Sequence, residues 1–237
     1  MSIKILVVNP NSSQKVSDNL AKILSAPPLV EFTFYTGPAS APKEINGTQT
    51  SIESEQVVLP DLLDKNVIEK YDGFLICCYS DHHLIHSLGK HTKKPILGIM
   101  QATLLYSLLN PSLHKLFILT SVSEWEPLLD QAIIDFIGTS QEFPTKKFQK
   151  TKALNVSVLD LSNEEEFAKI KNQVDHFVNV EYANDHIDCI LLGCAGMAGL
   201  DSKLSQAFPQ IQFIDSVKVG VEFLTSIIRF NKENILS

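Results

Sequence analysis

The chain has 237 residues, of which 44% are hydrophobic and 20% are charged. This balance is typical of a globular protein and excludes a disordered chain. Lys and Arg number 20 against 27 Asp and Glu, so the formal charge of −7 gives no electrostatic basis for binding nucleic acid. The lysine cluster at 146, 147, 150 and 152 lies in a polar stretch and predicts a solvated loop.

The first apolar run begins almost at Met1, with no charged segment or cleavage site before it. The longest apolar stretch, Cys189–Leu200, is shorter than the ~20 residues that a membrane helix needs. We therefore expect a soluble, cytoplasmic protein with no membrane partner. Four cysteines in a chain of this length do not suggest a disulfide framework, and we expect reduced thiols.

Short apolar runs rich in β-branched residues alternate with helical patterns along the chain. The runs that predict strands are Ile3–Val8, Val30–Tyr35, Gly73–Cys78, Ile96–Ile99, Lys115–Leu119, Asn155–Leu159, Asp188–Gly193 and Gln212–Ile214. Strands that are apolar throughout and alternate with helices are typical of parallel sheets covered on both faces. The sequence therefore predicts an α/β fold.

Helix start signals lie between these strands. Ser12 or Ser13 can cap a helix whose apolar residues recur on one face. The segment 123–126, Ser-Glu-Trp-Glu, predicts a capping box before another amphipathic helix. Asn163 precedes three glutamates and a further helix, and Val217 begins the apolar face of the last one.

The sequence also contains an internal repeat. Tyr71–Cys78 aligns without a gap with Ile187–Cys194, at an offset of 116 residues. Lys4–Asn9 aligns with Lys115–Thr120 at an offset of 111 residues. Each offset is about half the chain, which favours a duplicated strand–turn–helix unit over a chance likeness. We expect two similar, pseudo-symmetric lobes, each a parallel sheet flanked by helices.

Such a duplication assigns residues 1–99 plus 216–237 to the first lobe and 100–215 to the second. A pseudo-twofold axis would relate the lobes and place the active site in the cleft between them. The loop Thr36–Thr50 is long and rich in Pro, Gly and Ser, and it follows the second strand on the cleft side. It is either a rim or lid that contacts substrate, or a solvated loop.

Ligands of open parallel sheets bind outside the carboxyl ends of the strands. Polar or reactive residues follow four of the predicted strands, and they define the candidate site: Asn9, Asn11 and Ser12; Cys78, Tyr79, Ser80 and Asp81; Thr120 and Ser121; Cys194, Ala195 and Gly196. We expect Cys78 and Cys194 to be catalytic and the others to bind substrate. Gly193 and Gly196 would also let the backbone approach a ligand closely.

Cys78 and Cys194 each lie at a predicted strand end before a helix, where backbone N–H groups and the helix dipole favour a thiolate. A single buried cysteine is usually an inert small hydrophobe. We expect this of Cys77, whose side chain points to the opposite face from its neighbour. We also expect it of Cys189, which lies at the start of its strand.

Two cysteines on opposite sides of one cleft suit one reaction class. Inversion of a carbon acid without a cofactor needs a base on one face of the carbon and an acid on the other, and the roles swap for the other enantiomer. A thiol and a thiolate can do this near neutral pH, provided that the carbon acid is fairly acidic. Donors from Asn9–Ser12 and from Thr120–Ser121 would stabilise the enolate-like oxygen.

The segments Ile5–Ser13, Cys78–Asp81 and Gly193–Met197 resemble the signatures of hydantoin and allantoin racemases in the aspartate/glutamate racemase superfamily. The resemblance covers nearly the whole chain and suggests a fungal-type member. It implies a two-lobed pseudo-symmetric fold and two-base racemisation with no cofactor and no metal. It also implies a 5-substituted hydantoin such as allantoin as substrate, with Cys78 and Cys194 as the catalytic pair.

Two segments depart from the family pattern. In Gly98–Ala102, Gln101 stands where the family has an acid, and the segment after Asp81 lacks the usual Pro-Gly. These changes leave the substrate less defined than the chemistry. The sequence also leaves open the C5 substituent, the resting thiolate and whether the chain forms a homo-oligomer.

Other functions remain as alternatives. A metal site would draw on a crowded group: Cys77, Cys78, Asp81, His82, His83 and His86. It lacks the spacing of known zinc motifs, so surface or supporting histidines are favoured. A decarboxylase or a cis–trans isomerase of the same fold is a related alternative, and such a decarboxylase needs only one cysteine, so the pair argues against it. A non-enzymatic ligand sensor would use the same polar loops. Phosphate-loop and dinucleotide motifs are absent from the sequence.

Overall fold

The computed structural model describes residues 2–138, 142–161 and 163–234, and the chain divides into two compact units. Met1–Ala102 and Val217–Ser237 form the first unit, and Thr103–Ser216 forms the second. These bounds differ by a few residues from those of the expected first lobe, 1–99 plus 216–237. Residues 235–237 lie outside the described part of the chain. Among the described residues, no helix is both long and apolar enough to cross a membrane.

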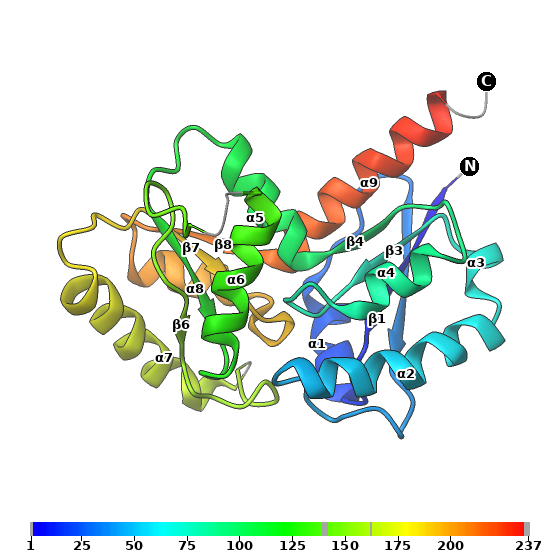
Figure 1. Cartoon of the computed structure of the whole chain (residues 1–237), viewed down its shortest axis with the longest axis horizontal. Coiled ribbons are helices and arrows are strands. Elements are labelled where there is room, and N and C mark those ends of the chain that lie inside the picture. Colours follow the sequence, from blue (N-terminus) through cyan, green and yellow to red (C-terminus); the bar gives the residue numbers. More distant parts are fainter. Residues whose placement is uncertain (1, 139–141, 162, 235–237) are drawn as a thin grey trace. The chain divides into compact units, whose positions relative to one another are not determined.

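Each unit is built on a four-stranded parallel sheet (Figure 1). The first sheet has the order β2-β1-β3-β4 and consists of β1 (Ile3–Asn9), β2 (Val30–Thr36), β3 (Gly73–Ile76) and β4 (Ile96–Gly98). The second has the order β6-β5-β7-β8 and consists of β5 (Leu116–Thr120), β6 (Lys152–Ala153), β7 (Cys189–Leu192) and β8 (Gln212–Asp215). The predicted α/β class with two similar units is confirmed.

Helices connect and cover these strands. Those of the first unit are α1 (Gln14–Ile23), α2 (Thr48–Asp64), α3 (Val67–Lys70), α4 (His83–Gly89) and, at the end of the chain, α9 (Ser216–Asn234). Helix α5 (Ile99–Leu109) begins in the first unit and ends in the second. The second unit contains α6 (Trp125–Ile137), α7 (Glu164–His176), the π-helix η1 (Phe177–Glu181), the 3-10 helix η2 (Ala195–Met197) and α8 (Leu200–Ala207).

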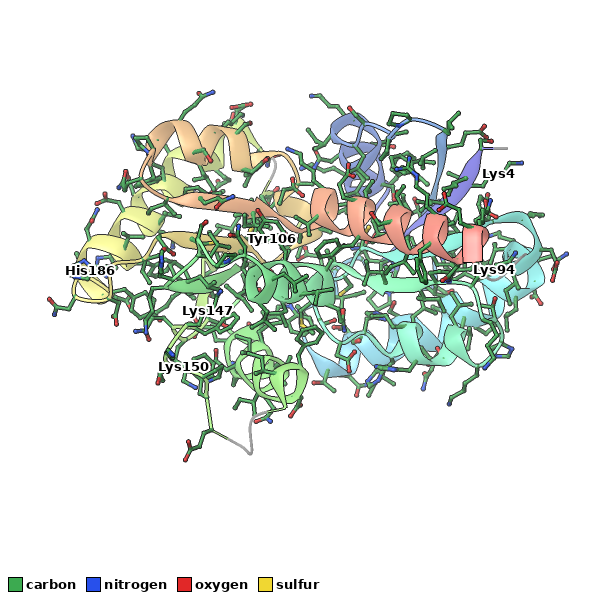
Figure 2. All side chains as sticks on the ribbon, turned by 90° about the horizontal axis from the view of Figure 1, so that it is seen from above. Lys4, Lys94, Tyr106, Lys147, Lys150 and His186 are labelled. Carbon is green, nitrogen blue, oxygen red and sulfur yellow. The ribbon has the colours of Figure 1, made fainter. Side chains whose placement is uncertain are left out.

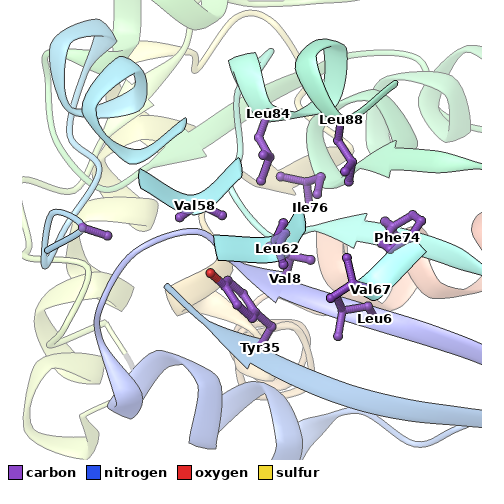
Figure 3. Packing of buried hydrophobic residues seen from close by; sticks show 11 residues of the cluster. Leu6, Val8, Tyr35, Val58, Leu62, Val67, Phe74, Ile76, Leu84 and Leu88 are labelled. Atoms are coloured by element: carbon purple, nitrogen blue, oxygen red, sulfur yellow. The ribbon is translucent and has the colours of Figure 1, made fainter. Parts of the chain in front are cut away.

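Alternate residues of β1 and β3 form the core on one face of the first sheet (Figure 3). Phe74 and Ile76 of β3 pack with Leu84 of α4 and Leu62 of α2, and all four are fully buried. Tyr35 of β2 borders the same cluster, and its hydroxyl donates a 2.7 Å hydrogen bond to Asp61 of α2. This packing fixes α4, and with it the segment that precedes α4.

Helix α9 covers part of the other face of the first sheet. A Cβ atom on Gly220 would lie 2.8 Å from Leu75 of β3, and one on Gly73 would lie 2.6 Å from Ile228. Lys232 also forms a 3.0 Å ion pair with Asp72. The carboxyl-terminal helix is therefore part of the first unit, although it follows the last strand of the second.

The repeat is visible in equivalent hydrogen bonds. In the first unit Asp72 accepts from the backbone N–H of Lys4 at 2.8 Å, and in the second Asp188 accepts from that of Lys115 at 3.0 Å. After the third strand of each sheet, the N–H of Cys77 donates to the carbonyl of Val8, and that of Gly193 donates to Leu119, both at 2.8 Å. The aligned segments thus occupy matching places in matching sheets.

Two predicted elements are wrong. Asn155–Leu159 is not a strand: Asn155 has a left-handed φ of 51°, and the strand of this region is the shorter β6. The capping box at 123–126 does not form, because α6 begins at Trp125 without a side-chain cap. The Glu126 carboxylate instead accepts a 2.8 Å hydrogen bond from the N–H of Ala153 in β6.

The lysine cluster lies along the segment that leads into β6 (Figure 2). Lys146 and Lys150 are exposed, as expected for a solvated loop, and Lys150 pairs with Asp130 at 3.4 Å. Lys147 and Lys152 are half-buried. Lys147 donates to a backbone carbonyl of the second unit and Lys152 forms an ion pair, so these lysines support local structure.

Candidate functional site

The first sheet brings Asn9 and the Cys78 turn to adjacent strand ends. Strands β1 and β3 pair in parallel with Val8 opposite Ile76. The chain leaves β3 after Ile76, and Cys78 lies two residues beyond, buried with 9% of its surface exposed. This position agrees with a reactive group at the carboxyl edge of the sheet.

Asn9 organises the loop that follows β1. It is fully buried, and its amide donates to the carbonyl of Ser13 at 3.0 Å and to the hydroxyl of Ser17 at 3.1 Å. Its carbonyl oxygen accepts from the N–H of Asn11 at 3.3 Å, and the Asn11 side chain accepts from Ser13 at 2.9 Å. Because both amide protons of Asn9 are engaged, Asn9 orders this loop and does not itself offer a donor to a ligand.

The loop expected over 36–50 is hydrogen-bonded to the segment that follows β1. The Ser12 hydroxyl donates to the carbonyl of Ala41 at 2.9 Å, and the N–H of Gly37 donates to the carbonyl of Asn11 at 2.9 Å. A Cβ atom at Gly37 would lie 2.9 Å from that carbonyl, so the close approach requires glycine. Helix α2 begins at Thr48, which shortens the loop. Loop and strand end therefore form one hydrogen-bonded structure.

Cys78 begins a tight turn that ends at α4. The Cys78 Sγ lies 3.5 Å from the Ser80 Oγ, and the N–H of Ser80 donates to the carbonyl of Cys78 at 3.0 Å. Cys78, Tyr79 and Ser80 are all buried. Helix α4 starts at His83 with His82 as its N-cap, so Cys78 is not at a helix N-terminus and the expected dipole effect does not apply to it.

Asp81 is held by two neighbours. One of its oxygens, Oδ1, lies 2.9 Å from the Nε2 of His86 and accepts a hydrogen bond from the amide of Gln101 at 2.9 Å. The other side of the Gln101 amide, its Oε1, is buried with no hydrogen-bond partner among the described residues. The glutamine thus complements Asp81, whereas an acid at this position would repel it.

Gln101→Glu should therefore destabilise the protein. The change replaces the amide donor by a carboxylate facing Asp81 and places negative charge on a buried oxygen. Compared with the wild type at the same pH, we expect the free energy of unfolding to be lower by about 2 kcal/mol at pH 7. This difference should shrink toward pH 4, as the introduced carboxyl takes up a proton. Urea unfolding at both pH values measures this. Gln101→Met is the matched control, and a glutamate variant no less stable than it at pH 7 would contradict the assignment.

The histidines of this region serve different purposes. His82 is fully buried, and its Nδ1 accepts from the N–H of Leu84 at 3.2 Å. Burial, and to a smaller extent the neighbouring His83, lowers the pKa of His82 to about 3, so the imidazole is neutral. Within the described chain, no three His, Cys, Asp or Glu side chains gather closely enough to hold a metal ion.

The second sheet places Thr120 and Cys194 at its own carboxyl edge. Thr120 ends β5, and its hydroxyl donates to the carbonyl of Gly193 at 3.4 Å. Cys194 follows two residues after β7, with 8% of its surface exposed, and precedes the short helix η2. Ser121 and Ala195 are buried beside these positions in the chain. The arrangement matches Asn9 and Cys78 in the first unit.

The glycines around Cys194 are needed for the packing of the protein's own chain. A Cβ atom on Gly193 would lie 2.5 Å from the Ile118 side chain, and one on Gly196 would lie 2.6 Å from the carbonyl of Val158. These glycines let the turn approach the protein's own chain. Helix η2 has three residues and the next helix, α8, starts at Leu200, so the expected helix dipole is weak here as well.

Asp215, which the sequence interpretation did not single out, holds the segment that contains Cys194. It is buried at the end of β8, and its carboxylate accepts a 2.8 Å hydrogen bond from the N–H of Gly199. That bond closes the segment from Cys194 to α8. The sequence does carry a signal for this role, namely an acidic residue directly after an apolar strand. A carboxylate buried there needs a hydrogen-bond donor.

Cys77 and Cys189 are the other two cysteines of the chain. Cys189 opens β7, pairs with Leu116 in the register of the sheet and is fully buried. Burial raises the pKa of the Cys189 thiol, Asp188 adds to this, and Lys147 opposes it. The Sγ of Cys77 lies 3.9 Å from the carbonyl of Leu75, back along β3.

Known proteins resemble this chain over almost its full length. The family described as Asp/Glu/Hydantoin racemase matches residues 5–224. The protein named DCG1 of Saccharomyces cerevisiae is 31% identical over 97% of this chain and 98% of its own length, and a hydantoin racemase of Rhizobium meliloti is 26% identical over 94% and 88%. The allantoin racemase of Klebsiella pneumoniae has a similar fold, with a TM-score of 0.79 at 20% identity over 97% of this chain and 89% of that one. This chain therefore belongs to the Asp/Glu/Hydantoin racemase family, as its signature segments predict, and with the family to the isomerase class.

Proposed function

We propose that this protein is a cofactor-independent racemase of 5-substituted hydantoins, allantoin foremost, with Cys78 and Cys194 as its two acid/base groups. One observation carries the proposal. Each of the two matching sheets has a buried cysteine two residues beyond its third strand, at the edge where ligands of parallel sheets bind. None of the four cysteines forms a disulfide in the described structure, and a cytoplasmic location is part of the proposal.

In the proposed reaction one sulfur is a thiolate and removes the C5 proton from one face of the ring. The electron pair passes to the adjacent carbonyl as an enolate. The thiol of the other cysteine then delivers its proton to the opposite face, and the enolate electrons form the new C–H bond. The reverse direction exchanges the roles. Each sulfur must come within roughly 3–3.5 Å of C5, so the mechanism requires sulfurs about 6–8 Å apart in the substrate complex.

The enolate oxygen needs hydrogen-bond donors. Both amide protons of Asn9 are donated to acceptors within its own loop, so other groups must donate to the enolate oxygen. We assign this role to the hydroxyl of Ser121 and to the backbone N–H groups of Ala195 and Gly196. Asn11, Tyr79 and the Asp81 carboxylate are assigned to the ring and side-chain N–H groups. Ser12 and Thr120 are proposed to line the substrate site without donating to the substrate, because their hydroxyls already donate to backbone carbonyls.

A hydantoin is the substrate class that suits thiolate chemistry. The C5 hydrogen is next to a ring carbonyl and is more acidic than the α-hydrogen of a free amino acid. A thiolate is a weak base toward carbon, and it is adequate for such a hydrogen without an electron sink such as pyridoxal phosphate. The relatives described as hydantoin and allantoin racemases support this class.

The test is optical. We expect (S)-allantoin, or another member of a panel of 5-substituted hydantoins, to lose its circular dichroism in the presence of the protein much faster than in a protein-free blank. In deuterium oxide the product should gain one deuterium at C5. A ligand sensor would bind without either change, and a decarboxylase would release carbon dioxide from a malonate-type substrate. No accelerated loss of optical activity with any member of the panel would refute the racemase.

A further inference from the structure

The hydroxyl of Ser80 is a close neighbour of one of the two proposed catalytic sulfurs. Its Oγ lies 3.5 Å from the Cys78 Sγ, within hydrogen-bond distance for sulfur, and Ser80 is 6% exposed. A neutral thiol can donate its S–H to this hydroxyl, but a thiolate can only accept. When Cys78 is ionised the Ser80 O–H must therefore donate to it, and a hydrogen bond to a charged, desolvated acceptor is a strong one.

The second repeat does not carry this hydroxyl. At the repeat offset, Ser80 corresponds to Gly196, and the two cysteines correspond to each other. A Cβ atom at Gly196 would lie 2.6 Å from the carbonyl of Val158 and 3.2 Å from that residue's side chain. No serine could be accommodated there without moving the backbone around it. The feature at Ser80 is thus specific to the first unit.

The charged groups of the turn do not replace this interaction. Asp81, three residues after Cys78, carries negative charge, which opposes a thiolate, and it is occupied by His86 and Gln101. His82 is buried and neutral, because burial and His83 lower its pKa to about 3. His82 therefore supplies no positive charge at the start of α4. The Ser80 hydroxyl is a polar group within hydrogen-bond distance of the sulfur.

We propose that Ser80 is a positioning residue that stabilises the thiolate of Cys78 by donating its hydroxyl hydrogen to the sulfur, within the two-base reaction proposed above. Its effect falls on Cys78 and not on Cys194. Removing one hydrogen bond to an ionised sulfur should lower the thiolate population at neutral pH by about tenfold.

Alkylation rates test this without relying on turnover. Native protein is treated with iodoacetamide between pH 5 and 10, and the labelling of each cysteine is followed by peptide mass spectrometry. Ser80→Ala should slow the labelling of Cys78 at pH 7 by about tenfold and move its pH midpoint upward. Cys194 in the same molecule should change less than about twofold. Ser80→Thr, which keeps a hydroxyl, should restore most of the rate.

Ser87→Ala is the matched control, because Ser87 lies on α4 and its hydroxyl donates to the carbonyl of Leu84 at 3.5 Å. Cys77 and Cys189 are 3% and 0% exposed, against 9% for Cys78 and 8% for Cys194, so they should be labelled far more slowly in every folded variant, which checks the fold during the experiment. An unchanged Cys78 rate in Ser80→Ala, or an equal slowing of Cys78 and Cys194, overturns the proposal. If labelling behaves as expected but no hydantoin is racemised, Ser80 is upheld and the proposed substrate reaction fails.

Discussion

Cys78→Ser and Cys194→Ser should each reduce racemisation of both enantiomers by about a thousandfold or more. A two-base mechanism needs a proton acceptor on one face and a donor on the other in either direction, and a serine hydroxyl is far too weakly acidic to replace the thiol near neutral pH. The loss of circular dichroism of each pure enantiomer, followed at saturating substrate, measures this effect.

Proton exchange gives each variant a distinct signature. A variant with one remaining thiolate can still remove the C5 proton from one face and return a solvent proton to that face. We therefore expect Cys78→Ser to incorporate deuterium into one enantiomer without inversion, and Cys194→Ser to do so with the opposite enantiomer. Incorporation into the same enantiomer by both variants would contradict the assignment of the two sulfurs to opposite faces.

Cys77→Ala and Cys189→Ala are the controls. Cys189 opens β7, whereas Cys194 lies two residues beyond the other end of that strand. The Sγ of Cys77 lies near the carbonyl of Leu75 in β3. Both variants should keep turnover within a few-fold of the wild type once folding has been verified by circular dichroism. If folded Cys189→Ala were as inactive as Cys194→Ala, the assignment of roles by position on the strand would be wrong.

The regular parts of the fold could be predicted because their signals are local. Apolar β-branched runs identify, to within a few residues, seven of the eight strands that the structure describes, and the strand ends identify the polar positions around Cys78 and Cys194. Strand β6 was missed because it has two residues, too few for a hydrophobic pattern. Helix α2 was missed because it contains Pro60 in its interior and the loop before it is rich in turn-forming residues.

The roles of single polar residues depend on partners distant in sequence. Glu126 has the spacing of a capping box, yet its carboxylate bonds Ala153, 27 residues away, because β6 lies beside the start of α6. Asp215 closes the Cys194 turn through Gly199, 16 residues before it. Such bonds depend on how strands and turns pack, and no local pattern encodes them. The sequence could therefore locate the site but not assign the hydrogen bonds that shape it.

His82→Asn should remove much of the protein's sensitivity to mild acid. The folded-state pKa of His82 is lowered by burial to about 3, while an unfolded histidine has a pKa near 6.5. Between these values the unfolded chain binds a proton that the folded protein does not, so stability falls as the pH falls. The slope should approach about 1.4 kcal/mol per pH unit below pH 6.5. Asparagine cannot be protonated, and its side-chain oxygen can still accept from the N–H of Leu84 at this N-cap.

The measurement is urea unfolding of both proteins from pH 7 to pH 4.5. The wild type should lose roughly 2–3 kcal/mol more than His82→Asn over this interval. The window excludes most of the titration of Asp61 and Asp72. Burial raises the pKa of each carboxyl, but the lowering interactions with neighbouring donors and lysines together exceed it, so both pKa values are lowered. His91→Asn, an exposed change on the turn after α4, should keep the wild-type slope. Any cavity left by asparagine lowers stability equally at every pH, so the slopes are compared rather than the absolute values. Equal slopes for wild type and His82→Asn would mean that His82 takes up its proton in the folded state. The conclusion that His82 is neutral in the folded protein would then be wrong.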